Sequence, residues 1–162
     1  MQYRTHIVTS VAAGAGIATT TDISFTFPYV IGIAIGALIP DIDEPNSFIG
    51  RRSFGLSKLI KTAFGHRGIT HSVLACFLFV LLYQKYPSNF TLGIAVGYAF
   101  HIVGDFFSKR GVPLFSPLFK KKLRSPLTYE TGGTQETILF YIGIAALIYF
   151  LYEYQLYMQL LS

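Results

Sequence analysis

Apolar residues in this chain gather into five segments, separated by polar stretches that contain proline or glycine. The segments cover residues 6–21, 25–39, 69–83, 90–107 and 137–157. Long apolar runs of this kind favour buried or membrane-embedded helices. The first three have about 15 residues each, whereas a helix needs roughly 20 to cross a hydrocarbon core. Polar residues at the helix ends, shielded in a protein-lined pocket, would supply the missing length.

Composition supports a membrane location. Hydrophobic residues make up 52% of the 162 residues and charged residues 13%, which is unusual for a soluble domain. We therefore expect an all-α integral membrane protein, a single domain over residues 1–162 with about five transmembrane helices. The alternative architecture is a soluble all-α bundle with unusually apolar helices. The lone cysteine, Cys76, excludes a disulfide or a thiolate metal site within the chain.

Glycine spacing also favours helices packed in lipid. Gly32 and Gly36 form one GxxxG pair, and Gly93 and Gly97 form another. Such pairs let helix backbones approach closely where no large side chain intervenes. The sequence therefore predicts close contacts along the second and fourth apolar segments.

Basic residues predict the orientation. All but one of the 13 basic residues precede the first segment or lie between segments two and three or four and five. They are Arg4; Arg51, Arg52, Lys58, Lys61 and Arg67; and Lys109, Arg110, Lys120, Lys121, Lys122 and Arg124. Five spans with a cytoplasmic N-terminus place all of them on the cytoplasmic side, as the positive-inside rule requires. We expect a multi-pass protein of a prokaryotic inner (plasma) membrane.

That topology brings potential metal ligands into one layer at the cytoplasmic helix ends. Ionisable groups in apolar surroundings are costly unless they are paired, hydrated or metal-bound. We predict a metal site from the acids and histidines of this layer: His6, Asp41, Asp43, His71, His101, Asp105 and Glu136.

Two local patterns strengthen this prediction. His101 and Asp105 are four residues apart, so a helix places both side chains on one face. Asp41 and Asp43 follow Pro40, where a non-helical turn could aim two carboxylates at one point. Mixed histidine and carboxylate ligands suit a transition metal, zinc or manganese, better than magnesium or calcium. The negative charges of the predicted carboxylate ligands could be balanced by one or two divalent ions.

Each residue also has a purely structural interpretation. Asp41 and Asp43 could belong to a turn, and His101 and Asp105 could form a buried hydrogen-bonded pair. Glu136 could favour the N-terminus of a helix electrostatically.

The motifs that carry these residues resemble the YdjM-like membrane-bound metal-dependent hydrolases, a family of bacterial and archaeal inner-membrane proteins. They are, in chain order, TH (5–6), LIPDIDEP (38–45), HRGITHS (66–72), GYAFHIVGD (97–105) and GVPLFSP (111–117). Glu136, in GGTQE, corresponds more loosely. The resemblance implies a membrane protein with a metal centre and a hydrolytic activity.

We therefore expect a metal-dependent hydrolase that acts on a phosphoester, possibly of a lipid, at the cytoplasmic membrane face. His66 and Arg67 are the candidate catalytic residues, since both could contact an anionic substrate. Arg51 and Arg52 lie in the same connection. Membrane lipids and an anionic small-molecule or lipid substrate are the expected partners, and no nucleic acid is expected.

Two other functions compete with the hydrolase. A metal or proton-coupled membrane carrier would use the same histidines and aspartates to bind and release an ion. However, carrier sites tend toward the bilayer midplane, whereas these residues gather at helix ends. A lipid-binding scaffold would use Lys120, Lys121, Lys122 and Arg124 to bind anionic headgroups, but this leaves the histidines unexplained.

Overall fold

The computed structural model describes residues 1–64, 68–119 and 121–161, and these form helices and connections without a strand. The α-helices are α1 (Tyr3–Thr20), α2 (Phe27–Gly36), α3 (Leu56–Phe64), α4 (Val73–Lys85), α5 (Asn89–Phe106), α6 (Thr134–Glu153) and α7 (Leu156–Leu161). Three 3-10 helices, η1 (Ile39–Asp43), η2 (Gly50–Arg52) and η3 (Ile69–His71), lie in the connections. The all-α prediction is confirmed, and the five apolar segments correspond in order to α1, α2, α4, α5 and α6.

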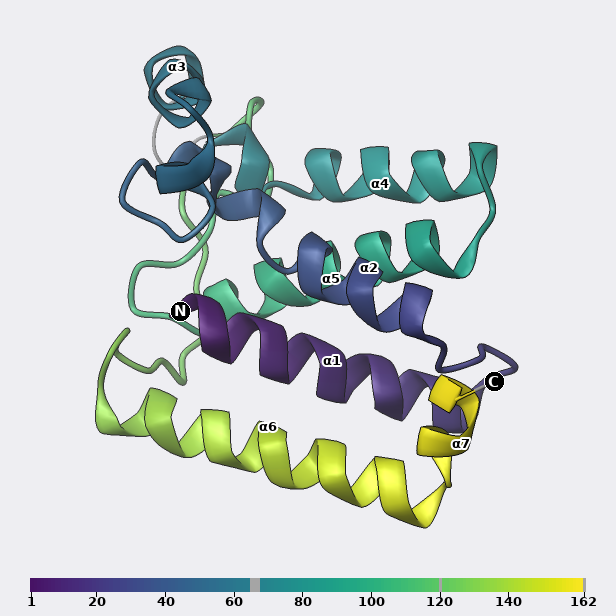
Figure 1. The fold of residues 1–162 in the computed structure, drawn as a ribbon. Coiled ribbons are helices and arrows are strands. Elements are labelled where there is room, and N and C mark those ends of the chain that lie inside the picture. Colours follow the sequence, from purple (N-terminus) through teal and green to yellow (C-terminus); the bar gives the residue numbers. More distant parts are fainter. Residues whose placement is uncertain (65–67, 120, 162) are drawn as a thin grey trace.

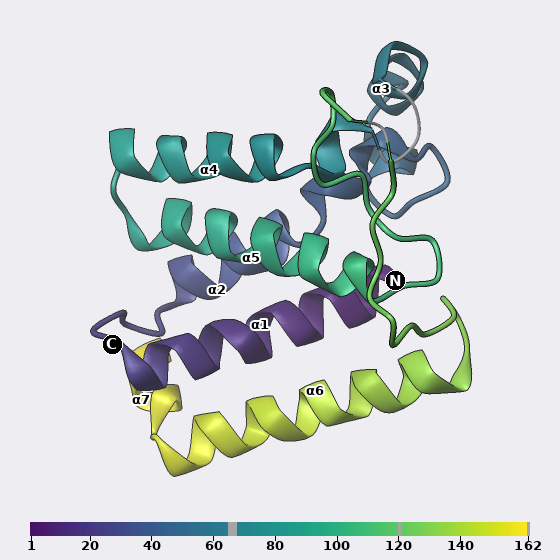
Figure 2. The same cartoon turned by 180° about the vertical axis from the view of Figure 1, so that it is seen from behind.

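These five helices lie side by side, as Figures 1 and 2 show. Helix α5 packs against α4, α2 and α1, and α1 in turn packs against α6. Within the described ranges, only α6 is long and apolar enough to cross a membrane, with 20 residues and a mean hydropathy of 1.5. The ten-residue α2 is about 15 Å long, half the thickness of a hydrocarbon core. The described residues thus contain one candidate membrane span, whereas the sequence predicts about five.

Both GxxxG pairs lie where α2 and α5 meet, as predicted. A Cβ atom added to Gly32 or Gly36 would collide with the backbone oxygen of Phe90 or Ile94 on α5. One added to Gly93 or Gly97 would collide with the backbone oxygen of Tyr29 or Ile33 on α2. The two backbones are therefore in direct contact, and this contact holds the polar residues that follow α2 beside α5.

Most of the polar connections gather at one end of the helices. The N-terminus, α3 and the long connection between α5 and α6 share that end, on the left in Figure 1. The opposite end carries the connections after α1 and α4. Helix α3 is an element that the apolar segments did not predict. It is seen end-on in both views, so it lies across the long helices.

Candidate metal centre

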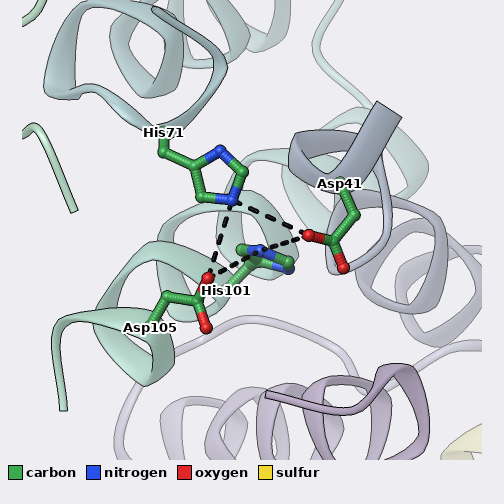
Figure 3. Close-up of side chains that lie close together, drawn as sticks. All are labelled: Asp41, His71, His101 and Asp105. Atoms are coloured by element: carbon green, nitrogen blue, oxygen red, sulfur yellow. Dashed lines mark ion pairs between the residues drawn. The ribbon is translucent and has the colours of Figure 1, made fainter. Parts of the chain in front are cut away.

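Four predicted ligands meet where three elements converge (Figure 3). Asp41 comes from η1, His71 from η3, and His101 with Asp105 from one face of α5. Pro40 lies in the first turn of η1, a position where its fixed φ is compatible with a helix. The hydroxyl of Ser72 accepts a hydrogen bond from the Ala75 amide and caps α4, so the chain turns immediately after His71.

The ligand atoms of the four residues all lie within 4.8 Å of one another. Nε2 of His71 is 3.8 Å from Asp41 Oδ1 and 3.6 Å from Asp105 Oδ2. Nε2 of His101 is 3.8 Å from the same two oxygens. Four nitrogen and oxygen ligands about 2.0–2.2 Å from a zinc ion lie roughly 3.3–3.6 Å apart. The spacing of these side chains is therefore close to that of a metal site.

In both His71 and His101, the ring nitrogen Nδ1, which faces away from the other ligands, contacts another group of the protein. Nδ1 of His101 is 2.6 Å from the carbonyl oxygen of Ala37, which can only accept a hydrogen bond. Nδ1 of His71 is 3.1 Å from the Thr70 hydroxyl and 3.4 Å from Asp43 Oδ2. Metal-binding histidines almost always have such a partner on the second nitrogen, which fixes the tautomer and leaves Nε2 for the ion.

The other ring nitrogen, Nε2, faces the ligand group and also supports a metal site. Nε2 of His71 and Nε2 of His101 are buried, and neither has a hydrogen-bond partner among the described residues. A buried polar nitrogen without a partner is costly. A cation at this position would satisfy both nitrogens, so the residues present fit a divalent transition metal.

The electrostatic environment keeps Asp41 ionised. Burial by itself would raise the pKa of Asp41, but the imidazoles of His71, His101 and His6 outweigh it and lower this pKa to about 2. These imidazoles favour the carboxylate form of Asp41, which is the form that binds a cation.

His6 and Asp43 adjoin this group from two sides. The imidazole rings of His6 and His101 are stacked, and His6 Nε2 is 3.4 Å from Asp105 Oδ1. Asp43 accepts hydrogen bonds from the Thr70 hydroxyl at 2.6 Å and the Gly68 amide at 3.3 Å. The sequence predicts both as ligands. Neither belongs to the group of four whose ligand atoms lie within 4.8 Å of one another, and both contact members of that group.

The segment that holds Asp41 and Asp43 also differs from the non-helical turn that the sequence predicts. It is the 3-10 helix η1. Its two carboxylates reach opposite nitrogens of one ring, since Asp41 faces Nε2 of His71 and Asp43 faces Nδ1.

Glu136 lies apart from the group. Its two carboxylate oxygens accept hydrogen bonds from the backbone amides of Gln2, at 2.5 Å, and Gly132, at 2.6 Å. It therefore joins the start of α6 to the start of α1. The predicted catalytic residues His66 and Arg67 lie outside the described residues.

Thr70 and Tyr98 are functional candidates that the sequence reasoning missed. The Tyr98 hydroxyl donates to the carbonyl oxygen of Thr70 at 2.5 Å, and the Thr70 hydroxyl contacts both Asp43 and His71. Tyr98 precedes His101 by three residues, so helical periodicity placed it near the same face. That spacing was the available signal.

The chain is similar to proteins of a known family. The profile of the family described as YdjM inner membrane protein matches residues 1–160. The inner membrane protein YdjM of Escherichia coli (strain K12) is 42% identical over 105 residues, which are 60% of this chain and 53% of that protein. The chain thus spans about half the length of that relative.

A second relative matches almost end to end. The protein named "Uncharacterized protein YvsG" of Bacillus subtilis (strain 168) is 32% identical over 158 residues, 93% of this chain and 94% of its own length. No solved structure matches the chain. The profile match over nearly the whole chain shows that it belongs to the YdjM inner membrane protein family.

Proposed function

We propose that this protein is a membrane-bound metal-dependent hydrolase that cleaves a phosphoester at the cytoplasmic membrane face. Asp41, His71, His101 and Asp105 would hold the ion. The observation that carries the proposal is the convergence of four ligand atoms within 4.8 Å, two of them buried imidazole nitrogens without a hydrogen-bond partner among the described residues. Membership in an inner-membrane family supports the location.

The donor set favours zinc or manganese, because imidazole nitrogen suits these ions and the two carboxylates balance one divalent charge. Such an ion acts as a Lewis acid and lowers the pKa of bound water toward about 7. The protein's contribution is to fix the ligands. Ala37, Thr70 and Asp43 orient the two imidazoles, and the His6 ring packs against His101.

The proposed topology has five membrane-crossing helices and a cytoplasmic N-terminus. It is supported by the gathering of the basic connections at the end that holds the ligands (Figure 1). The short helices α2 and α4 would be completed by the protein-lined polar layer at that end. Polar groups are tolerated at membrane depth when they are buried in protein.

Metal analysis of detergent-purified protein tests the proposal. Supplemented wild type should carry about one zinc or manganese ion per chain, and His101→Ala or Asp105→Asn should lose most of it, since each removes a ligand. Arg124→Ala, outside the centre, is the control and should bind as wild type does. A metal-free wild type, or an Asp105→Asn variant that binds normally, would refute the site.

Activity is tested on the metal-loaded protein with nitrophenyl phosphate monoesters and diesters. Wild type should release nitrophenol, and His71→Ala should not. If metal binds, no ester is cleaved and liposomes containing the protein show metal flux, the carrier function replaces the hydrolase.

A further inference from the structure

Access to the candidate metal centre is restricted to one side. The side chains of His71, His101 and Asp105 are fully buried, whereas 17% of the Asp41 side chain is exposed. Asp41 lines a cavity of about 510 Å³ at the polar end of the helices. A substrate would therefore reach the centre from this cavity, through Asp41.

Two arginines from different connections line the same cavity. Arg51 belongs to η2, and Arg110 follows α5. Both are exposed, and neither has an ion-pair partner among the described residues. Besides Asp41, the cavity contains one more acid, Glu44, which is 3.4 Å from Lys61 Nζ. Planar guanidinium groups bind phosphate oxygens in a bidentate manner, so this cavity is suited to a phosphate group.

An apolar path begins beside this cavity. A cavity of about 470 Å³ and another of about 270 Å³ share Gly104, Phe107 and Leu139. Met1 lines both and also lines the arginine cavity. Met1 is therefore the residue that the three cavities have in common.

The path runs along the groove between α5 and α6. Figure 2 shows α1 between these two helices, and α1 forms the floor through Thr9 and Ala12. The walls are apolar and open to the outside, since Val103 on α5 is 47% exposed and Ile142 on α6 is 59% exposed. In a membrane protein such a groove faces acyl chains.

We propose that the groove between α5 and α6 holds the acyl chain of a lipid phosphomonoester, with its phosphate between Arg51 and Arg110 beside Asp41. This inference rests on the proposed function, because it assigns the substrate class of the same centre. A charged head beside the ligands and an apolar tail along the helices match the change from polar to apolar lining. A soluble phosphate ester would leave the groove unused.

Binding of three probes to the full chain in detergent tests the proposal. The probes are dioctanoyl phosphatidic acid, glycerol phosphate, which lacks the chains, and dioctanoylglycerol, which lacks the phosphate. Phosphatidic acid should bind at least about tenfold more tightly than either of the others. Equal affinity for glycerol phosphate and phosphatidic acid would assign the site to soluble esters and overturn the lipid proposal.

Variants separate the two halves of the site. Arg51→Gln and Arg110→Gln should weaken both phosphate probes about tenfold or more. Ile142→Trp and Val103→Trp, which narrow the groove from opposite walls, should weaken phosphatidic acid alone. The controls are Arg124→Gln, whose guanidinium donates to the Lys109 carbonyl outside the cavity lining, and Ile148→Trp, 60% exposed on α6. Both controls should match wild type.

Metal content measured on the same samples distinguishes the two proposals. If wild type is metal-loaded but neither arginine nor groove variants alter lipid binding, the lipid site is refuted and the metal site stands. If wild type carries no metal yet the binding pattern holds, the hydrolase fails and the lipid site stands.

Discussion

The imidazole rings of His6 and His101 are stacked, with centroids 3.7 Å apart and planes inclined by 7°. These residues are 95 positions apart in the chain, and α1 and α5 bring them together. The stack supports the His101 ring, while Ala37 holds its Nδ1 atom. His6 therefore restricts the rotation of a proposed ligand without belonging to the four-residue group.

We expect His6→Ala to lower metal affinity by about 10–100-fold, the usual loss when a residue that orients a ligand is removed. His101→Ala should cost more, since it removes a ligand. His6→Phe retains a ring for the stack and should fall between His6→Ala and wild type. Competition with a calibrated chelator measures all three affinities. Equal losses for His6→Ala and His101→Ala would instead make His6 a ligand.

Asp43→Asn should weaken metal binding about 10–100-fold. The carboxylate of Asp43 lies 3.4 Å from His71 Nδ1 and also accepts from Thr70, so its charge increases the basicity of that imidazole and holds its orientation. Thr70→Val removes the intervening hydroxyl and should have a smaller effect in the same direction. The same chelator titration reports both changes. Normal affinity in Asp43→Asn would show that His71 needs no carboxylate partner.

Glu136→Gln should leave metal content unchanged, because the carboxylate binds the amides of Gln2 and Gly132 instead of facing the ligand group. It should lower thermal stability, since hydrogen bonds to a charged acceptor contribute about 1.5–3 kcal/mol. Metal analysis and a melting curve on one preparation measure both. Loss of metal with unchanged melting would restore Glu136 as a ligand, as its sequence position suggests.

Gly93→Ala should lower the free energy of unfolding by about 1–3 kcal/mol, typical of overpacking a close contact. The new methyl group would collide with the backbone oxygen of Tyr29, which cannot move without displacing α2. Gly16→Ala is a matched helical control, because its methyl group would meet only the Phe150 ring, at 3.3 Å. Denaturant titration in detergent compares the two. Similar stabilities would show that α2 and α5 separate easily.

Reporter fusions should place the connections containing Arg51 and Lys121 in the cytoplasm and the segment after α6 outside, given the distribution of basic residues. Lys85, at the end of α4, should face outward. A cytoplasmic reporter after α6 would exclude five spans. Release of the protein by carbonate without detergent would favour a peripheral bundle instead.

The sequence alone was sufficient for properties that depend on neighbours along the chain. Apolar runs predicted the helices α1, α2, α4, α5 and α6, and helical periodicity placed His101 and Asp105 on one face. The spacing of Gly32 with Gly36 and of Gly93 with Gly97 predicted backbone contact, because only glycine admits such close approach. Local patterns of this kind can be recognised in the sequence without knowing which helix will be the partner.

Tertiary structure decided which acidic residues face the centre. Asp41 and Asp43 are two positions apart in one motif, yet η1 directs them to opposite nitrogens of His71. Glu136 carries a carboxylate that could bind a metal, but the backbone amides of Gln2 and Gly132 donate hydrogen bonds to its two oxygens. A side chain's role here depends on the nearest partner in space, and that partner is set by how α1, α5, η1 and η3 pack, which no spacing along the chain encodes.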